Sequence, residues 1–349
     1  MKPLRSGDLE SAGHVDPADE IAPRPRPVSG PVRLLAPSRV PSVLSDEVFT
    51  RTAILMDTFI AIEVIAPKGT PEPTAAMERA LGWFAEVEVR CSRFDPKSEV
   101  MRLTRFAGSP VKVSKVLFEV VRFAVAIAQA SGGAFDPAVG HVLEARGFNR
   151  DYRTGQSVDT GLDPEARPSF RDIRLDPARS TITLKRSLIV DLGGVAKGMA
   201  IDLAAKELSQ YESFAIDAGG DLYLKGRNPL GRPWRVGIRD PRREEALLET
   251  LQISDAAVCT SGDYERRAPD ESGEHHILDP KTGRSAAEVA SVTVVAPTAM
   301  VADALATAAF VLGPERGIRF LERQGVAGLI ISSSLERHAT AGLARYTVA

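Results

Sequence analysis

Short apolar segments with the character of β-strands recur along this chain, and helical segments lie between them in an irregular order. The first 150 residues predict a strand or strand pair over 52–64 and helices over 72–92 and 116–131. Six more strands are predicted at 182–184, 214–217, 234–238, 257–260, 292–295 and 329–332. Three more helices are predicted near 195–210, 301–312 and 314–324. Because strands and helices follow no strict βαβ rhythm, their order predicts an α+β fold with mixed sheets and packed helices.

The first 46 residues differ in composition from the rest of the chain. They are rich in Pro, Arg and acidic side chains, and they contain no continuous apolar stretch, twin arginine or cysteine. This composition is typical of a disordered arm, so we expect an arm over 1–46 and one folded domain over 47–349. No targeting segment is recognisable and no run of ~18 apolar residues occurs, so a cytoplasmic location without a membrane segment is expected.

Charge and cysteine content exclude several classes of protein. The chain has 44 basic and 46 acidic residues and a net charge of −2, which gives no support for nucleic-acid binding. Cys91 and Cys259 form no CxxC motif, so neither a disulfide framework nor a zinc site is predicted.

An alanine-rich run places Asp303 and Thr307 four residues apart, on one face of a predicted helix. A carboxylate and a hydroxyl offer hard oxygen atoms, which suit Mg²⁺ beside a phosphate and do not suit zinc. His276, in the His-His-Ile-Leu-Asp-Pro run, has a side chain able to transfer protons nearby. The alternative for Asp303 and Thr307 is a buried polar pair that satisfies backbone groups.

Residues 189–208 predict a strand, a tight turn at Gly193-Gly194 and an amphipathic helix. Glycine lets the backbone approach a ligand, and a helix N-terminus attracts phosphate. Lys197 would add a positive charge beside the same anion. The segment is neither a Walker loop nor a GxGxxG fingerprint, so a plain strand-to-helix turn with a solvated lysine is the alternative.

Six motifs follow one another between residues 132 and 308. They are GGAFDPAVG (132–140), DLGGVAKG (191–198), DAGGDL (217–222), TSGDYER (260–266), HHILDPKTG (275–283) and ADALATA (302–308). In this order and spacing they resemble the ApbE family, the FAD:protein FMN transferases, over residues 56–313 or so. The resemblance implies the ApbE-like flavin transferase fold for 47–349.

The resemblance implies a Mg²⁺-dependent enzyme. Such an enzyme cleaves the pyrophosphate of FAD, releases AMP and joins FMN through a phosphoester bond to a Thr or Ser hydroxyl. The implied partner is an acceptor flavoprotein with a motif like Ser/Thr-Gly-Ala-Ser/Thr. Two alternatives stay open: an FAD pyrophosphatase, which forms FMN and AMP with water in place of the hydroxyl, and a non-catalytic FAD-binding protein.

Site residues follow from the same resemblance. The implied metal ligands are the side-chain oxygens of Asp303 and Thr307 and the backbone carbonyl of Gly194, with Ala306 beside them. The residues implied in FAD binding are Met56, Phe94, Ala134, Phe135, Asp136, Asp191, Lys197 and Val292, or Thr293 in place of Val292.

His276 is the candidate general base for the acceptor hydroxyl, aided by Asp279. A hydroxyl is a poor nucleophile unless its proton is removed as the bond to phosphorus forms. The alternative is a histidine that only hydrogen-bonds FAD or a loop.

Three positions depart from the family pattern. Thr104 stands where Asn is common, Ala138 replaces a Thr, and Arg146 replaces the Trp of a Trp-Gly-Phe sequence. Thr104 and Ala138 are expected to alter contacts with FAD.

Overall fold

An eight-stranded antiparallel sheet forms the middle layer of the molecule because several of its strands are apolar on both faces. The computed structural model describes residues 30–35, 46–163, 166–268 and 273–347. In β14 (Val289–Ala296) every residue is buried: Val292 and Val294 join the core on one face, and Ala290 and Val295 join the core on the other. A sheet of this kind needs a covering layer on each side.

The strand order of this sheet crosses the sequence order repeatedly. Every pair of neighbours is antiparallel. In spatial order the strands are β16 (Arg337–Ala339), β15 (Ala327–Ser332), β14, β11 (Ala256–Gly262), β8 (Asp221–Lys225), β7 (Ser213–Ala218), β3 (Thr58–Pro67) and β2 (Asp46–Leu55).

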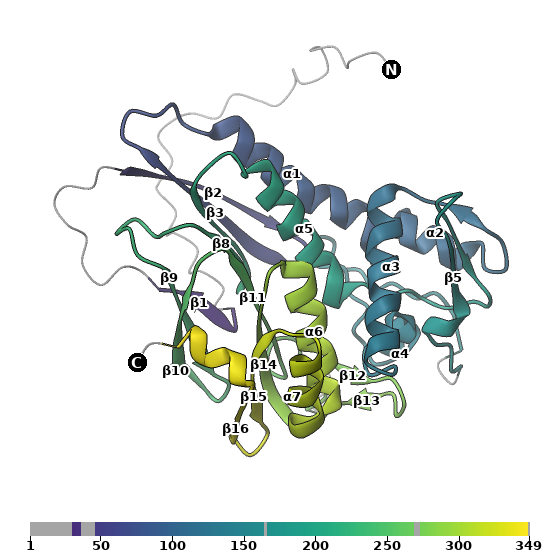
Figure 1. The fold of residues 1–349 in the computed structure, drawn as a ribbon. Helices are drawn as coiled ribbons and strands as arrows, with labels where there is room; N and C mark the ends of the chain where they lie inside the picture. Colours follow the sequence, from purple (N-terminus) through teal and green to yellow (C-terminus); the bar gives the residue numbers. More distant parts are fainter. Residues whose placement is uncertain (1–29, 36–45, 164–165, 269–272, 348–349) are drawn as a thin grey trace, which may run out of the picture.

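Helices cover one face of this sheet (Figure 1). They are α1 (Thr74–Cys91), α5 (Gly193–Glu207), α6 (Ala299–Leu312) and α7 (Pro314–Arg323). Beyond one end of α1 lies a smaller group of elements. It consists of α2 (Glu99–Arg105), α3 (Lys115–Ala130), α4 (Gly140–Ala145) and the short strands β4 (Val111–Lys112), β5 (Ile173–Asp176) and β6 (Thr181–Leu184).

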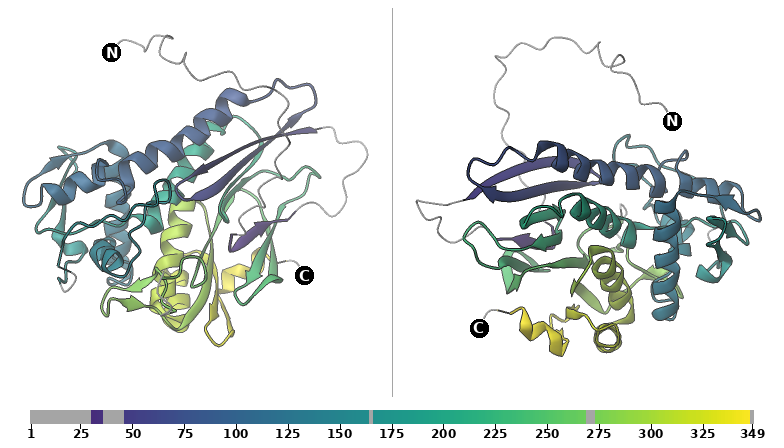
Figure 2. Two further views of the ribbon diagram at one scale, coloured as in Figure 1. Left: turned by 180° about the vertical axis from the view of Figure 1, so that it is seen from behind. Right: turned by 45° about the horizontal axis from the view of Figure 1, so that its top comes forward.

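A three-stranded sheet covers the other face, as the turned views in Figure 2 show. Its order is β1 (Val32–Leu34), β9 (Trp234–Asp240) and β10 (Arg243–Ile253). Inward side chains of β9 form a second core with Leu222 and Leu224 of β8. Short 3-10 turns at Pro137–Val139, Phe170–Asp172 and Ala341–Arg345 and a hairpin of β12 (Leu278–Asp279) and β13 (Arg284–Ser285) complete the described elements.

β1 corrects the expected N-terminal boundary. Residues 30–35 fall inside the expected arm of 1–46, yet β1 pairs with β9, and Val32 is 1% exposed. An apolar Val-Arg-Leu segment was overlooked there because Pro and Arg dominate its surroundings. Residues 1–29 and 36–45 of the expected arm lie outside the described residues.

The α+β class is confirmed, and the remaining predicted elements have counterparts, but the strand predicted at the start of 189–208 is wrong: among the described residues, 189–192 form no strand and lead directly into α5. Several short strands, together with β8 and β10, were not predicted. The strand pair expected at 52–64 is the β2–β3 hairpin, with a two-residue turn at Met56-Asp57. Both turn residues have positive φ, 54° and 60°, as this tight type of hairpin turn requires. No helix in the described ranges is both long and apolar enough to cross a membrane.

Candidate functional site

The first turn of α5 is bent at Gly194. Its φ and ψ of −89° and 19° break the helix. The Gly198 N–H, which in a regular helix would donate to the Gly194 carbonyl, lies 3.3 Å from Oδ2 of Asp303 and donates to it. A Cβ on Gly194 would lie 3.0 Å from Oγ1 of Thr307 and 3.2 Å from the Phe135 ring, so glycine permits this close approach.

α6 brings Asp303 and Thr307 to the end of α5. The Thr307 hydroxyl donates to the Asp303 carbonyl at 3.3 Å and lies 3.2 Å from Oγ of Ser261, at the end of β11. Asp303 is only 7% exposed. The structure therefore places a buried carboxylate, a hydroxyl and the bent backbone of Gly194 together.

Lys197 forms a charged pair beside this group. Its Nζ lies 2.7 Å from Oδ2 of Asp221, and Oδ1 of Asp221 accepts from the Thr260 N–H at 3.1 Å. Burial alone would lower the pKa of Lys197, but the negative charges of Asp221 and Asp303 raise it above its usual range. The lysine is therefore charged and paired, which excludes the solvated lysine considered above.

Asp303 lies in an environment that favours a cation. Burial and the nearby charge of Asp221 raise its pKa to about 7, although Lys197 acts in the opposite direction. A bound divalent cation would stabilise the carboxylate form. No cluster of three or more His, Cys, Asp or Glu in the described part of the chain could hold a metal. One carboxylate with a hydroxyl and a carbonyl instead forms an all-oxygen set, which fits Mg²⁺.

Asp191, which lies two residues before the start of α5, is held in place by Arg93. Nε of Arg93 lies 2.5 Å from Oδ2 of Asp191, and the Gly193 N–H donates to Oδ1 at 3.0 Å. Burial alone would raise the pKa of Asp191, but Arg93 and the Gly193 amide bring it below its usual value. The Arg93 guanidinium also lies 4.2 Å from the centre of the Phe94 ring and donates to the Phe148 carbonyl.

Arg266 lies between several of the predicted residues. It pairs with Asp57 at 3.4 Å, in the turn that also carries Met56. The Met56 N–H donates to a carboxylate oxygen of buried Glu88 at 3.3 Å, which holds this turn against α1. The carbonyl of Arg266 accepts the backbone N–H of His276 at 3.1 Å, so Arg266 joins the Met56 turn to the His276 segment.

The imidazole of His276 is neutral at pH 7. Burial, and then the positive charge of Arg266, lower its pKa to about 3. Its Nδ1 lies 3.3 Å from the Arg266 carbonyl, and the edge of the Phe148 ring packs on it with ring centres 6.5 Å apart. A neutral imidazole is in the form that a general base needs, but a pKa this low makes it a weak base until a nearby negative charge raises the pKa.

Several predicted site residues also accept hydrogen bonds from the backbone or lie buried in the core. Asp279 accepts from a backbone N–H in the β12–β13 turn at 2.9 Å. Asp136 accepts from two backbone amides, at 2.9 and 3.1 Å. Val292 is fully buried opposite Ser261. The other buried members of the predicted set are Ala134, Phe135 and Ala306.

The three departures from the family pattern have local explanations. The Thr104 hydroxyl donates to the Leu188 carbonyl at 2.9 Å. Ala138 is 1% exposed and fits inside the core. Arg146 forms an ion pair with Glu274 at 3.0 Å.

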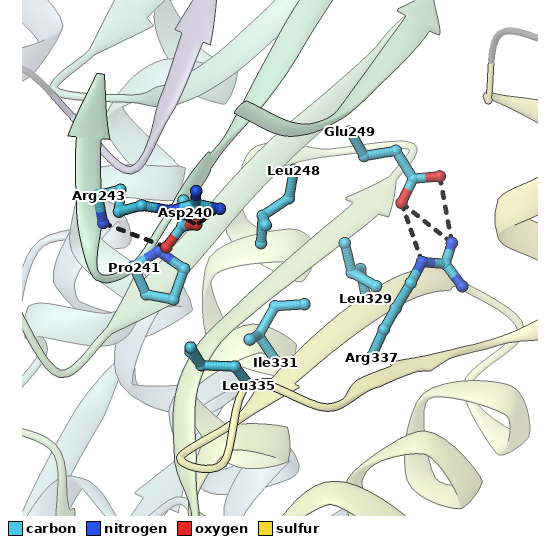
Figure 3. A pocket seen from close by; sticks show the side chains of 9 residues that line it. All are labelled: Asp240, Pro241, Arg243, Leu248, Glu249, Leu329, Ile331, Leu335 and Arg337. Atoms are coloured by element: carbon cyan, nitrogen blue, oxygen red, sulfur yellow. Dashed lines mark hydrogen bonds and ion pairs between the residues drawn. The ribbon is translucent and has the colours of Figure 1, made fainter. Parts of the chain in front are cut away.

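A pocket of about 250 Å³ lies elsewhere, between the β9–β10 and β15–β16 hairpins (Figure 3). Apolar side chains such as Leu329 and Ile331 line it between two ion pairs, Asp240–Arg243 and Glu249–Arg337. None of the predicted site residues lines this pocket.

Sequence reasoning missed Asp221, Arg93, Ser261 and Arg266 as members of the site. Asp221 and Ser261 stand inside quoted motifs, which was a usable signal; Asp221 begins β8, and Ser261 lies near the end of β11. Arg266 also ends a quoted motif, TSGDYER, whereas Arg93 lies in none of the six, and the partner of either arginine is recognised only once the chain is folded.

Known proteins resemble this chain in sequence and in structure. A sequence model of the ApbE family matches residues 56–330. A curated relative from Treponema pallidum, an FAD:protein FMN transferase, is 32% identical over 318 residues, which is 84% of this chain and 87% of the relative. The ApbE protein of Thermotoga maritima has a similar structure, with a TM-score of 0.77, 29% identity and coverage of 87% and 100%. The flavin transferase ApbE of Vibrio cholerae gives a TM-score of 0.75, 27% identity and coverage of 86% and 99%.

Proposed function

The chain belongs to the ApbE family of flavin-transferring enzymes, and from this we propose that it transfers the FMN part of FAD to a Thr or Ser hydroxyl of an acceptor flavoprotein with Mg²⁺ bound. The observation that carries the proposal is the convergence of Asp303, Thr307 and the bend at Gly194 beside the Lys197–Asp221 pair.

Asp303, Thr307 and the Gly194 carbonyl would hold the metal. Bound Mg²⁺ would neutralise the charge that develops on the pyrophosphate oxygens during in-line displacement. Gly194 keeps the N-terminus of α5 close to Thr307, and this helix end favours the negatively charged phosphates. Lys197, held by Asp221, adds a fixed positive charge.

His276 would take the proton from the acceptor hydroxyl. The hydroxyl oxygen forms a bond to the FMN phosphorus while the bond from this phosphorus to the bridging oxygen breaks. AMP leaves with the bridging oxygen, and the acceptor keeps FMN as a phosphoester. The imidazole is unprotonated before the reaction, but its lowered pKa makes it a weak base, so the role requires that the negative charge of bound FAD raise this pKa.

The flavin would lie between the Met56 turn and the start of α5. Arg266 links the Met56 turn to the His276 segment, and Arg93 fixes Asp191 beside Phe94. These contacts favour a preformed pocket for FAD, with Ala134, Phe135 and Asp136 next to the bend at Gly194. The catalytic role of Asp279 and the cytoplasmic location stay predictions.

The test incubates purified protein with FAD and Mg²⁺, with and without a protein that carries the Ser/Thr-Gly-Ala-Ser/Thr motif. Chromatography follows AMP, and intact mass spectrometry follows the acceptor. We expect a covalent FMN adduct that EDTA abolishes. An acceptor with its motif Thr or Ser changed to Ala is the matched control. AMP without an adduct would support the pyrophosphatase instead, and bound but uncleaved FAD would support a binding protein.

A further inference from the structure

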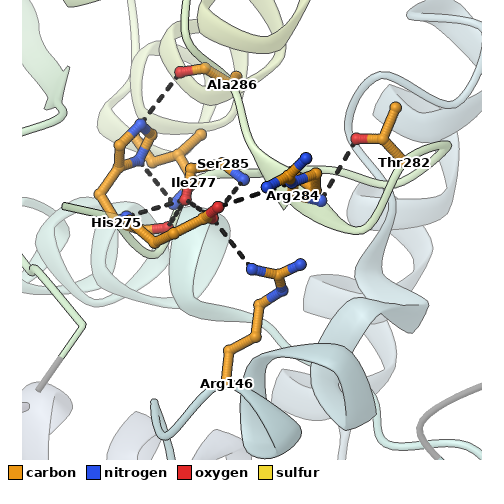
Figure 4. A network of polar contacts seen from close by, with 8 residues as sticks. Arg146, His275, Ile277, Thr282, Arg284, Ser285 and Ala286 are labelled. Carbon is orange, nitrogen blue, oxygen red and sulfur yellow. Dashed lines mark hydrogen bonds and ion pairs between the residues drawn. The ribbon is translucent and has the colours of Figure 1, made fainter. Parts of the chain in front are cut away.

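Glu274 contacts both Ser285 and Arg146 in a polar network around the segment that carries His276. Figure 4 shows Arg146, His275, Arg284 and Ser285 of this network. Its Oε2 accepts from the Ser285 N–H at 2.9 Å, lies 2.7 Å from the Ser285 hydroxyl and lies 3.0 Å from Nη1 of Arg146. The Ser285 hydroxyl is also 2.6 Å from the carbonyl of His275. The network therefore joins the two chain segments that enter and leave the β12–β13 hairpin, immediately beside His276.

Arg146 connects this network to the segment that carries Phe148, whose ring packs on His276. Arg146 follows the last residue of α4, and Phe148 lies two residues further along the chain. The ring of Phe148 packs edge-on against His276, and its carbonyl accepts from Arg93, which holds Asp191. The Arg146–Glu274 pair thus ties the backbone that carries His276 to the segment that packs on its imidazole.

The charge and partial burial of the Arg146–Glu274 pair suit it to keep the two segments that it joins in a fixed relative position. The Glu274 and Arg146 side chains are 20% and 29% exposed. Hydrogen bonds from Ser285 lower the pKa of Glu274, and the charge of Arg146 acts in the same direction, so the carboxylate is ionised at neutral pH. A charge-assisted contact that is partly shielded from water is directional. By contrast, Arg284 approaches Glu274 only to 3.8 Å and is 75% exposed.

We propose that Glu274 and Arg146 are positioning residues for His276. They set the orientation of its imidazole toward the acceptor hydroxyl and take no part in the chemistry. This inference rests on the proposed function, in which His276 accepts the proton. It assigns a role to Arg146, which stands where the family pattern has an aromatic residue.

The test compares Arg146→Ala, Arg146→Lys and Glu274→Gln with the wild-type protein. The readouts are kcat and KM for FMN transfer, FAD affinity by flavin fluorescence, and the Tm. Arg146→Ala should lower kcat roughly tenfold, because a small displacement of a catalytic group is costly, and leave FAD affinity within about twofold. Arg146→Lys keeps the charge and should recover part of kcat. Glu274→Gln should resemble Arg146→Ala.

Arg284→Ala is the matched control, because it removes another arginine from the same carboxylate and should keep kcat. A kcat for Arg146→Ala within twofold of wild type would overturn the inference. Equal losses in kcat, FAD affinity and Tm without recovery by Arg146→Lys would also overturn it, because they indicate a general structural role. His276→Ala, measured in parallel, separates the two proposals. If His276→Ala is slow and Arg146→Ala is not, only the positioning role is wrong; if His276→Ala keeps the wild-type rate, both are wrong.

Discussion

The pKa values of individual side chains in this site depend on a few nearby charged groups. Lys197 pairs with Asp221 and Asp303 lies nearby, so the positive charge of one lysine interacts with two carboxyl groups. The spacing of Asp303 and Thr307 in the sequence predicted their common face, because four residues are about one helical turn. The pairing of Lys197 with Asp221 was not predictable, because it joins residues on a helix and a strand that only the tertiary fold brings together.

On the proposed metal assignment, Asp303→Ala should reduce turnover by about a hundredfold or more, since it would remove an oxygen ligand of Mg²⁺ near the reacting phosphate. The Gly198 N–H loses its acceptor, but the fold should survive because the change also removes a buried carboxylate whose charged form is disfavoured by burial. AMP release with FAD and Mg²⁺ measures turnover, and near-UV circular dichroism checks the fold. Full activity in the presence of Mg²⁺ would show that the metal assignment is wrong.

His276→Ala should slow FMN transfer roughly 10²–10⁴-fold, the usual contribution of a general base. FAD binding should change far less, because the contacts of the ring are with the Arg266 carbonyl and Phe148 of the chain itself. Single-turnover rates and fluorescence titration separate the two effects. Comparable losses in rate and affinity would favour a role in FAD binding.

The Arg93–Asp191 pair should stabilise the protein only above the acidic range. The pKa of Asp191 is lower in the folded protein than its usual value, because Arg93 and the Gly193 amide outweigh burial. Its contribution is therefore complete above about pH 4 and is lost as the pH falls through the lower folded value. The free energy of unfolding of Asp191→Asn, relative to wild type, should be constant from about pH 8 to 5. A difference that disappears between pH 7 and 5 would contradict this assignment.

Several site residues lie at or near helix ends, and the sequence predicts the positions of these ends better than their detailed geometry. The glycine pair at 193–194 and the helix that follows were predicted, because glycine interrupts an apolar pattern. The bend at Gly194 was not, because it depends on Thr307 and Asp303 of another helix. Likewise, β10 escaped prediction because its exposed, charged residues give no clear alternation.

Asp202 should be important for the stability of α6, although it lies on α5. Its carboxylate oxygens accept from the Ala299 and Met300 N–H groups, at 2.7 and 3.0 Å, where α6 begins. Asp202→Ala would leave these amides without their partners and should lower the free energy of unfolding by about 2 kcal/mol. Urea titration measures the loss.

The comparison for Asp202 is Thr298→Ala, which removes a bond of 3.4 Å from the Val301 N–H at the same helix end and a hydroxyl hydrogen bond to Asp202, but leaves the Asp202 bonds to the helix amides in place. It should cost about 0.5 kcal/mol, near the low end for such caps. A larger loss for Thr298→Ala than for Asp202→Ala would show that Asp202 does not support α6.

The outer three-stranded layer of the molecule includes a strand, β1, that the sequence did not predict. The helix layer and most strands of the large sheet were predictable, because their apolar periodicity is strong. β1 was not, because three residues carry too little pattern, and its burial comes from pairing with β9. Gly30 lies so close to the turn after β7 that a Cβ would be 2.3 Å from the Gly219 carbonyl oxygen.

Deletion of residues 2–45 should therefore lower the Tm by about 5 °C, because it removes β1 and exposes an edge of β9. Deletion of residues 2–29 leaves Gly30 and β1 in place and is the matched control. Differential scanning calorimetry compares the two proteins. Equal changes of Tm in both deletions would contradict a stabilising role for β1.

The pairing of β1 with β9 also has a consequence for how the protein is made. Val32 meets Ile238, so the first described strand must wait for a partner that the ribosome adds much later. At the usual pace of protein synthesis, about 200 intervening residues take roughly 10–40 s to appear. The β2–β3 hairpin, whose strands are adjacent in sequence, can form long before that. The nascent chain therefore begins its sheet layer early, and its N-terminal segment is among the last to reach its native place.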